Sequence, residues 1–181
     1  YKRHFGAYIN ARGKKSNHGG YYMHLEPEGC LVAGGAYCLP SDVLRAVRQS
    51  ICEQPELSTA IVGSDPFHSL FPVLGETRVK TIPKGFPKDF PYPEYIRCKD
   101  YSCCHPVPED FFTAPDWLER TAGMFEIMKP FLDLSMQPLM SSETVSLPQK
   151  LHNSRTTTAR CSLIDRIIAT QRRHNPARLT A

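Results

Sequence analysis

The sequence predicts an α+β fold: an antiparallel sheet of about five strands, helices packed on one face, and a long C-terminal helix. Three observations lead to this prediction. Short stretches of alternating apolar and polar residues are separated by glycine- and proline-rich turns, as in antiparallel strands. Other stretches carry apolar residues at helical spacing. A length of 181 residues, with 41% hydrophobic and 22% charged residues, suits one globular domain.

A hairpin at residues 20–38 is the most clearly marked part of the predicted sheet. Pro27 and Gly29 fit a three-residue loop, in which proline opens the turn and glycine takes the left-handed position. Pairing of Glu26 with Cys30 then sets the register, because strand side chains alternate between two faces. This register predicts an apolar face with Met23, Leu25, Leu31 and Ala33, and an opposite face with Tyr22, His24 and Glu26, where Tyr22 lies across from Gly34.

The other elements follow from the same two periodicities. Further strands are predicted at 4–10, 77–82 and 99–104, where apolar and polar residues alternate. Helices are predicted at 41–53, 55–61 and 116–136, with shorter turns at 65–71 and 94–97. The run 83–93 contains four prolines, so we expect an irregular loop there.

The charge distribution divides the chain into a body and a tail. Residues 141–181 are rich in serine and threonine and hold seven of the 22 Lys+Arg residues but two of the 18 Asp+Glu residues. Residues 1–140 are therefore close to neutral, with 15 basic and 16 acidic residues. We predict a single α+β domain at 1–140 and a basic, largely disordered tail at 141–181. A near-neutral body gives no support to nucleic-acid binding.

The cysteines and the hydropathy pattern predict a cytoplasmic protein with no membrane partner. Seven cysteines at irregular spacing indicate reduced thiols and not a disulfide framework. Cys98, Cys103, Cys104 and His105 lack the spacing of a zinc site, so we interpret the thiols as incidental or buried. No apolar run approaches the roughly 20 residues that span a bilayer.

A set of short motifs is distributed along residues 1–140. They are Tyr1-Lys2, Phe5-Gly6, Gly13-Lys14-Lys15-Ser16, Gly20-Tyr21-Tyr22, His24-Leu25-Glu26-Pro27, Gly29, Gly34-Gly35, Lys80, Pro83-Lys84-Gly85-Phe86 and Lys99-Asp100. Together these motifs resemble the bacterial and fungal family called domain of unknown function 2461. The resemblance implies no catalytic role, because the family has no assigned activity. It also implies that this chain lacks an upstream segment that family members carry before Tyr1.

The loop between the first strand and the hairpin is one candidate site. Lys14, Lys15 and Ser16 lie among glycines there, and cations beside exposed backbone N–H groups suit a phosphate or carboxylate. Tyr22, and Lys84 of the proline-rich loop, are predicted to complete this ligand-binding set. The spacing fits no P-loop or dinucleotide fingerprint, so a solvated loop is the alternative interpretation.

His24 and Glu26 form the second candidate site. Two residues apart on a strand, they share a face, so the carboxylate can orient the imidazole for general-base catalysis, or both can bind a metal ion. Two ligands are too few for a metal site, and we assign no metal or cofactor from sequence alone. A third ligand would have to come from elsewhere in the chain, with His4, His18 and Asp100 as the candidates. The alternative is a purely structural contact.

These patterns lead to two functions of different classes. The first is non-catalytic binding of an anionic, phosphate-bearing small molecule through Lys14, Lys15, Ser16, Tyr22 and Lys84. The second is a small enzyme with His24 as general base and Glu26 as its orienting group, or a weak metal site at the same residues. The sequence does not choose between a binding protein and an enzyme.

Overall fold

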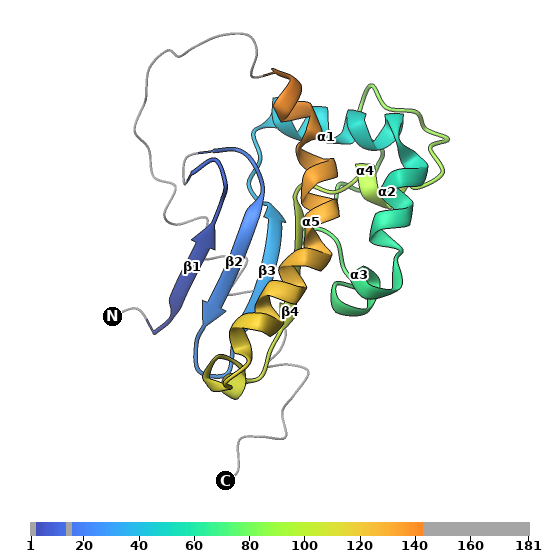
Figure 1. Ribbon diagram of the computed structural model, residues 1–181. Coiled ribbons are helices and arrows are strands. Elements are labelled where there is room, and N and C mark those ends of the chain that lie inside the picture. Colours follow the sequence, from blue (N-terminus) through green and yellow to red (C-terminus); the bar gives the residue numbers. More distant parts are fainter. Residues whose placement is uncertain (1–2, 14–15, 143–181) are drawn as a thin grey trace.

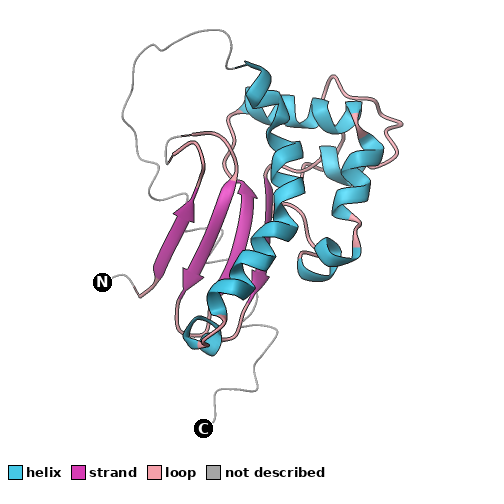
Figure 2. Ribbon diagram, viewed as in Figure 1, coloured by secondary structure: helices cyan, strands magenta, loops and turns pink. Residues whose placement is uncertain are grey.

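Four antiparallel strands form the sheet in a computed structural model, which describes residues 3–13 and 16–142. In the described chain the sheet has the spatial order β1-β2-β3-β4, and Figure 2 shows the helices gathered on one of its sides. The predicted α+β class, with an antiparallel sheet and a C-terminal helix, is confirmed. The strands are β1 (Phe5–Ile9), β2 (Gly20–Leu25), β3 (Leu31–Ala36) and β4 (Tyr101–Pro106).

The longest helix, α5 (Trp117–Ser142), crosses the sheet, with α1 (Ser41–Glu53) packed beside it (Figure 1). Gly34 of β3 makes the close approach of α5 possible, because a side chain there would collide with the sulfur of Met128. The remaining described helices are α2 (Pro55–Val62), α3 (Asp65–Leu70), α4 (Pro93–Ile96) and the 3₁₀ helix η1 (Glu109–Thr113). Proline occupies one of the first two positions of α2, α3 and α4, where its missing N–H costs no helical hydrogen bond.

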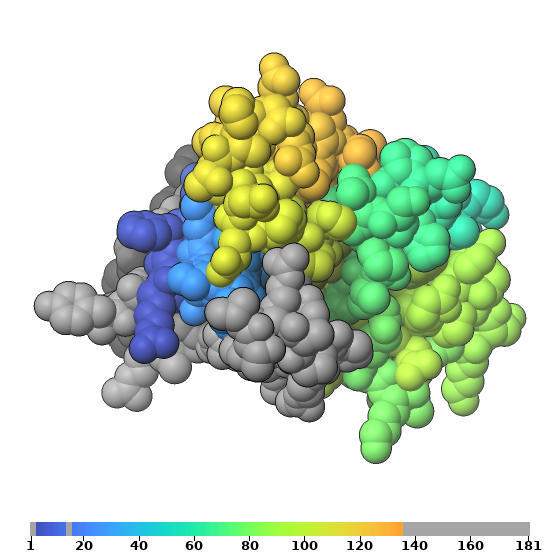
Figure 3. All heavy atoms as spheres, turned by 90° about the horizontal axis from the view of Figure 1, so that it is seen from below, coloured from blue at the N-terminus to red at the C-terminus, as the bar shows by residue number. Residues whose placement is uncertain are grey.

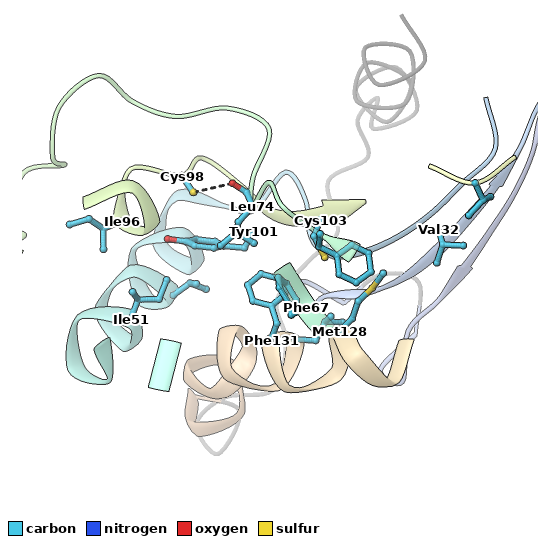
Figure 4. Close-up of a cluster of buried hydrophobic side chains, with 14 of the residues drawn as sticks. Val32, Ile51, Phe67, Leu74, Ile96, Cys98, Tyr101, Cys103, Met128 and Phe131 are labelled. Carbon is cyan, nitrogen blue, oxygen red and sulfur yellow. Dashed lines mark hydrogen bonds between the residues drawn. The ribbon is translucent and has the colours of Figure 1, made fainter. Parts of the chain in front are cut away.

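The hydrophobic core lies between the sheet and these helices (Figure 4). Val32 and Cys103 enter it from the sheet, and Met128 and Phe131 enter it from α5. Tyr101 is fully buried and donates its hydroxyl hydrogen to the backbone oxygen of Tyr95 at 2.9 Å. None of the helices in the described ranges is long and apolar enough to cross a bilayer.

The hairpin register differs from the prediction by one residue. His24 pairs with Leu31 and Tyr22 pairs with Ala33, so Leu31 and Ala33 share the face of His24 and do not share that of Met23. The cause is the turn: Gly29 N–H donates to the Glu26 carbonyl, and Glu28, not Gly29, takes the left-handed conformation, with φ 64°. A one-residue shift moves every side chain of β3 to the opposite face.

The strand expected at 77–82 is reduced to a single bridge between Arg78 and Cys98. Two backbone hydrogen bonds flank it, from Val79 N–H to the Arg97 oxygen and from Lys99 N–H to the Thr77 oxygen. On one side of the bridge the pairing ends because the chain before Arg97 is the helix α4. On the other side the Asp100 carboxylate binds the N–H groups of Glu76 and Thr77. The described sheet therefore has four strands where about five were predicted.

The cysteines of the described ranges are free thiols, and three of those in the core, Cys30, Cys98 and Cys103, donate hydrogen bonds to backbone carbonyls. Cys98 donates to the Glu94 carbonyl at 3.2 Å, and Cys103 donates to the Gly34 carbonyl at 3.7 Å. Burial, followed by the negative charge of Glu76, raises the pKa of Cys104 to about 11. Burial also raises the pKa values of Cys98 and Cys103, so all three thiols are protonated at neutral pH.

Candidate metal-binding site

Three polar side chains of the hairpin lie together on the face of the sheet that is turned away from α5. Tyr22 and His24 are alternate residues of β2, and Glu26 follows where the turn begins. The neighbouring Tyr21 points to the other face, where its ring centroid lies 4.5 Å from that of Phe125 in α5. The period of two thus brings His24 and Glu26 into contact, as the sequence pattern predicts.

His24 is the centre of this group and is fully buried, with an exposed fraction of 0%. Its Nδ1 atom lies 3.1 Å from the Tyr22 hydroxyl, and its Nε2 atom lies 3.2 Å from Oε2 of Glu26. In the neutral imidazole, the Tyr22 hydroxyl donates to Nδ1 and Nε2–H donates to the carboxylate. Both ring nitrogens of His24 are therefore in hydrogen-bond contact with side chains of the same hairpin.

His4 reaches the same place from the chain just before β1. The register of β1 and β2 pairs Phe5 with Leu25, so one step further His4 comes beside Glu26. The His4 and His24 ring centroids are 4.9 Å apart, with an angle of 32° between the ring planes. The ligand atoms of His4, His24 and Glu26 all lie within 4.8 Å of one another. Of the three residues named as possible third ligands, the structure brings His4 to the pair.

Gly6 is the residue of this site that sequence reasoning missed. It lies opposite His24 in the β1–β2 pairing, and a side chain at this position would collide with the Tyr22 hydroxyl. The missing side chain therefore leaves the space in which the Tyr22 phenol lies, within reach of His24. Tyr22 thus covers Gly6, and not Gly34 as the hairpin prediction had it. The sequence held one signal for this contact. The alternation of residues 4–10 predicts a strand, and it puts Gly6 on a strand next to the one that carries Tyr22.

The loop expected to bind an anion is only partly described, because Lys14 and Lys15 lie outside the described residues. Its Ser16 hydroxyl contacts Nδ1 of His18 at 2.8 Å and accepts the His18 backbone N–H at 3.0 Å. Burial and the nearby charge of Arg12 lower the pKa of His18, which favours the neutral imidazole. In the described part of this loop, the Ser16 hydroxyl is thus used in hydrogen bonds to His18 of the same loop.

Lys84 and Asp100 do not join the hairpin residues. The segment that contains Lys84 packs against α1, where the Arg45 guanidinium carbon lies 5.6 Å from the centre of the Phe86 ring. Figures 1 and 3 place this segment and β1 on opposite sides of the molecule. Asp100 accepts hydrogen bonds from two backbone N–H groups and the Ser102 hydroxyl, so its carboxylate anchors the loop before the Arg78 bridge.

One comparison with known proteins gives a match. The model of a family described as conserved hypothetical protein (DUF2461) matches residues 1–134, which include both strands and the turn of the site. No curated protein and no solved structure matches the chain.

Proposed function

We propose that this chain, which belongs to the DUF2461 family of conserved hypothetical proteins, binds a divalent transition-metal ion through His4, His24 and Glu26. The observation that carries the proposal is the convergence of two imidazoles and one carboxylate, from the adjoining ends of β1 and β2, around the buried ring of His24. Imidazole nitrogen and carboxylate oxygen are the donors of His₂Glu sites, for which zinc is the best-suited ion.

The distances support this ligand set. Donor atoms that share a tetrahedral zinc ion at about 2.0–2.1 Å lie roughly 3.3 Å from one another. Nε2 of His24 and Oε2 of Glu26 are 3.2 Å apart, so these two donors already have the required separation. His4 must approach by at most about 1.5 Å, since no pair of the three donors exceeds 4.8 Å. The His4 side chain is only partly buried, so a small rotation can close this gap.

Tyr22 supplies the second support, because a ligating histidine almost always uses its other ring nitrogen in a hydrogen bond. If Nε2 of His24 held the metal ion, Nδ1 would carry the proton and could donate it to the Tyr22 hydroxyl, 3.1 Å away. This bond would hold the ring in the orientation that directs Nε2 toward Glu26. The contacts of His24 thus fit one ligating nitrogen and one orienting nitrogen.

Three protein ligands leave one position of a tetrahedral ion for water or another oxygen ligand. A phosphate or carboxylate would bind there directly, with the metal ion as the source of positive charge. Binding of an anionic small molecule, the first function expected from the sequence, would thus occur at the metal ion and not through a lysine-rich loop. Positive charge would come from the metal ion and from residues near β1, since the segment that contains Lys84 lies on the opposite side of the molecule from β1.

The second candidate function is acid–base chemistry without a metal ion, and the hydrogen-bond chain Tyr22–His24–Glu26 favours it. Both nitrogens of His24 are in contact with protein groups, so the atom that would face a substrate is the Tyr22 oxygen. In this candidate His24 accepts the phenolic proton and Glu26 stabilises the resulting imidazolium. The two candidates differ in their need for His4, which contributes to the metal site alone.

Metal titration of the metal-stripped protein tests the proposal. We expect one zinc ion per chain in competition with a chromophoric chelator, and at least 100-fold weaker binding in His4→Ala and Glu26→Gln. Cobalt(II) should give a tetrahedral spectrum without a sulfur charge-transfer band, and inorganic phosphate should alter that spectrum. The matched control is His68→Ala, which removes an exposed histidine of α3. Zinc affinity that survives His4→Ala unchanged would refute the metal site.

A further inference from the structure

The free edge of β1 differs from the other edge of the sheet. Within the described ranges β1 pairs with β2 alone, and all five of its residues are exposed. At the opposite edge, Gly75 N–H donates to the Ser102 oxygen of β4 at 2.8 Å, so a loop covers that strand. Unpaired strand edges are places where another extended chain can add to a sheet.

The side chains of β1 form an exposed apolar stripe. Phe5 is 80% exposed and Ile9 is 48% exposed, and both point to the same face because they are four residues apart on one strand. Ala7 lies between them. Figure 1 shows that β1 lies beyond the part of the sheet that α5 crosses, so the helix does not cover the stripe. An added strand would place alternate apolar side chains against Phe5 and Ile9.

The charges around β1 select the kind of strand that fits. Residues 1–25 contain five Lys+Arg residues and no Asp or Glu, and exposed Arg3 and Arg12 flank the strand at its two ends. The basic tail 141–181 would repel this region. A second copy paired antiparallel about Ala7 would bring Arg3 of each copy near Arg12 of the other, and like charges close together are destabilising.

We propose that the β1 edge binds an extended acidic segment of a partner protein as an additional strand of the sheet. Its backbone would pair with β1, its alternate apolar side chains would cover Phe5 and Ile9, and its carboxylates would lie near Arg3 and Arg12. The residues that form this surface, Arg3, Phe5, Ile9 and Arg12, differ from the proposed metal ligands, which are His4, His24 and Glu26.

Fluorescence anisotropy with a labelled eight-residue peptide of alternating glutamate and valine tests this proposal on the 181-residue chain. We expect binding at least tenfold tighter than that of the matching lysine–valine peptide. The double variant Phe5→Thr/Ile9→Thr and the variant Arg3→Glu should each weaken binding at least tenfold. The control variants make the same kinds of substitution elsewhere on the surface. Val73→Thr replaces an apolar side chain that is 61% exposed, and Lys84→Glu replaces an exposed basic side chain by an acidic one.

Two further measurements distinguish strand addition from other binding. A peptide with alternate N-methylated amides cannot pair along one edge, so its affinity should fall at least tenfold; equal affinity overturns the proposal. Light scattering should show a monomer without peptide. A dimer that Phe5→Thr/Ile9→Thr dissociates would make the occupant a second copy and would also overturn it. If the acidic peptide does not bind at all, the proposal is likewise overturned.

Discussion

His24 shows how one residue acquires a potential function from its neighbours. On the strand it is one member of an alternating pattern, and a His–Glu pair alone is two ligands. The structure buries it completely, places Tyr22 on one ring nitrogen and Glu26 on the other, and brings His4 beside it. Gly6 contributes by having no side chain, since the Tyr22 phenol occupies the space. The chemistry therefore depends on residues of two strands.

Replacing Tyr22 by phenylalanine tests the orienting role of its hydroxyl. Removing a hydrogen-bond partner of a metal-ligating histidine typically weakens metal binding 10- to 100-fold, so we expect zinc affinity to fall by about tenfold or more in Tyr22→Phe. Stability should change little because the ring still covers Gly6. Competition titration against the chelator measures the change, and Tyr8→Phe, a tyrosine on the next strand, is the control. Equal affinities for wild type and Tyr22→Phe would exclude the orienting role.

At the scale of elements, β1 depends on β2 for its place in the sheet. The strand is exposed along its length and, in the described chain, pairs with no other strand. A metal ion bound by His4, just before β1, and by His24 and Glu26 of the hairpin would join the two strands at one end. The metal ion would then stabilise the strand whose outer edge we propose as the binding surface.

Hydrogen exchange measures this coupling directly. Opening of β1 would separate His4 from the other ligands, so zinc at one hundred times its Kd should stabilise the closed strand by about 2.7 kcal/mol. The β1 amides that donate hydrogen bonds to β2 should then exchange up to about 100-fold more slowly, while those of β4 remain unchanged. His4→Ala should abolish the difference. Protection that appears equally in β1 and β4 would indicate general stabilisation instead.

The hairpin turn shows how a small local choice changes a whole strand. Proline and glycine in the turn marked its position correctly, but Glu28 takes the left-handed conformation that was expected at Gly29. The change shifts the register by one residue, so Val32 and Gly34 face α5 in place of Leu31 and Ala33. Gly35, with φ 120°, has no room for a side chain against the Tyr101 carbonyl of β4.

For the whole molecule, buried thiols predict loss of stability at alkaline pH. Burial raises the pKa of Cys104 from 9.0 to about 11, so above pH 9 the unfolded chain loses this proton while the folded chain keeps it. Unfolding is then favoured as pH rises from 9 toward 11, with a loss of stability on the order of 1 kcal/mol at pH 10 from this thiol. Burial raises the pKa values of Cys98 and Cys103 as well, which acts in the same direction.

Urea denaturation at pH 8 and pH 10 in the presence of reductant checks this expectation. The free energy of unfolding should fall between the two pH values, and Cys104→Ser should reduce the fall by about 1 kcal/mol because serine does not titrate in this range. The corresponding control is Cys38→Ser, which changes an exposed thiol. A loss of stability that is the same in Cys104→Ser and wild type would contradict the assignment to this half-buried thiol.

The sequence by itself determined the α+β class, the main helices and the common face of Tyr22, His24 and Glu26, because periodicity within one strand or helix is local backbone geometry. Tertiary structure decided the rest. It set the register of β3 through the turn at Glu28, reduced 77–82 to one bridge beside α4, and brought His4 to the pair. It also placed the segment that contains Lys84 on the opposite side of the molecule from β1. These features depend on contacts between segments that are distant in the sequence. The local pattern of apolar and polar residues therefore does not predict them.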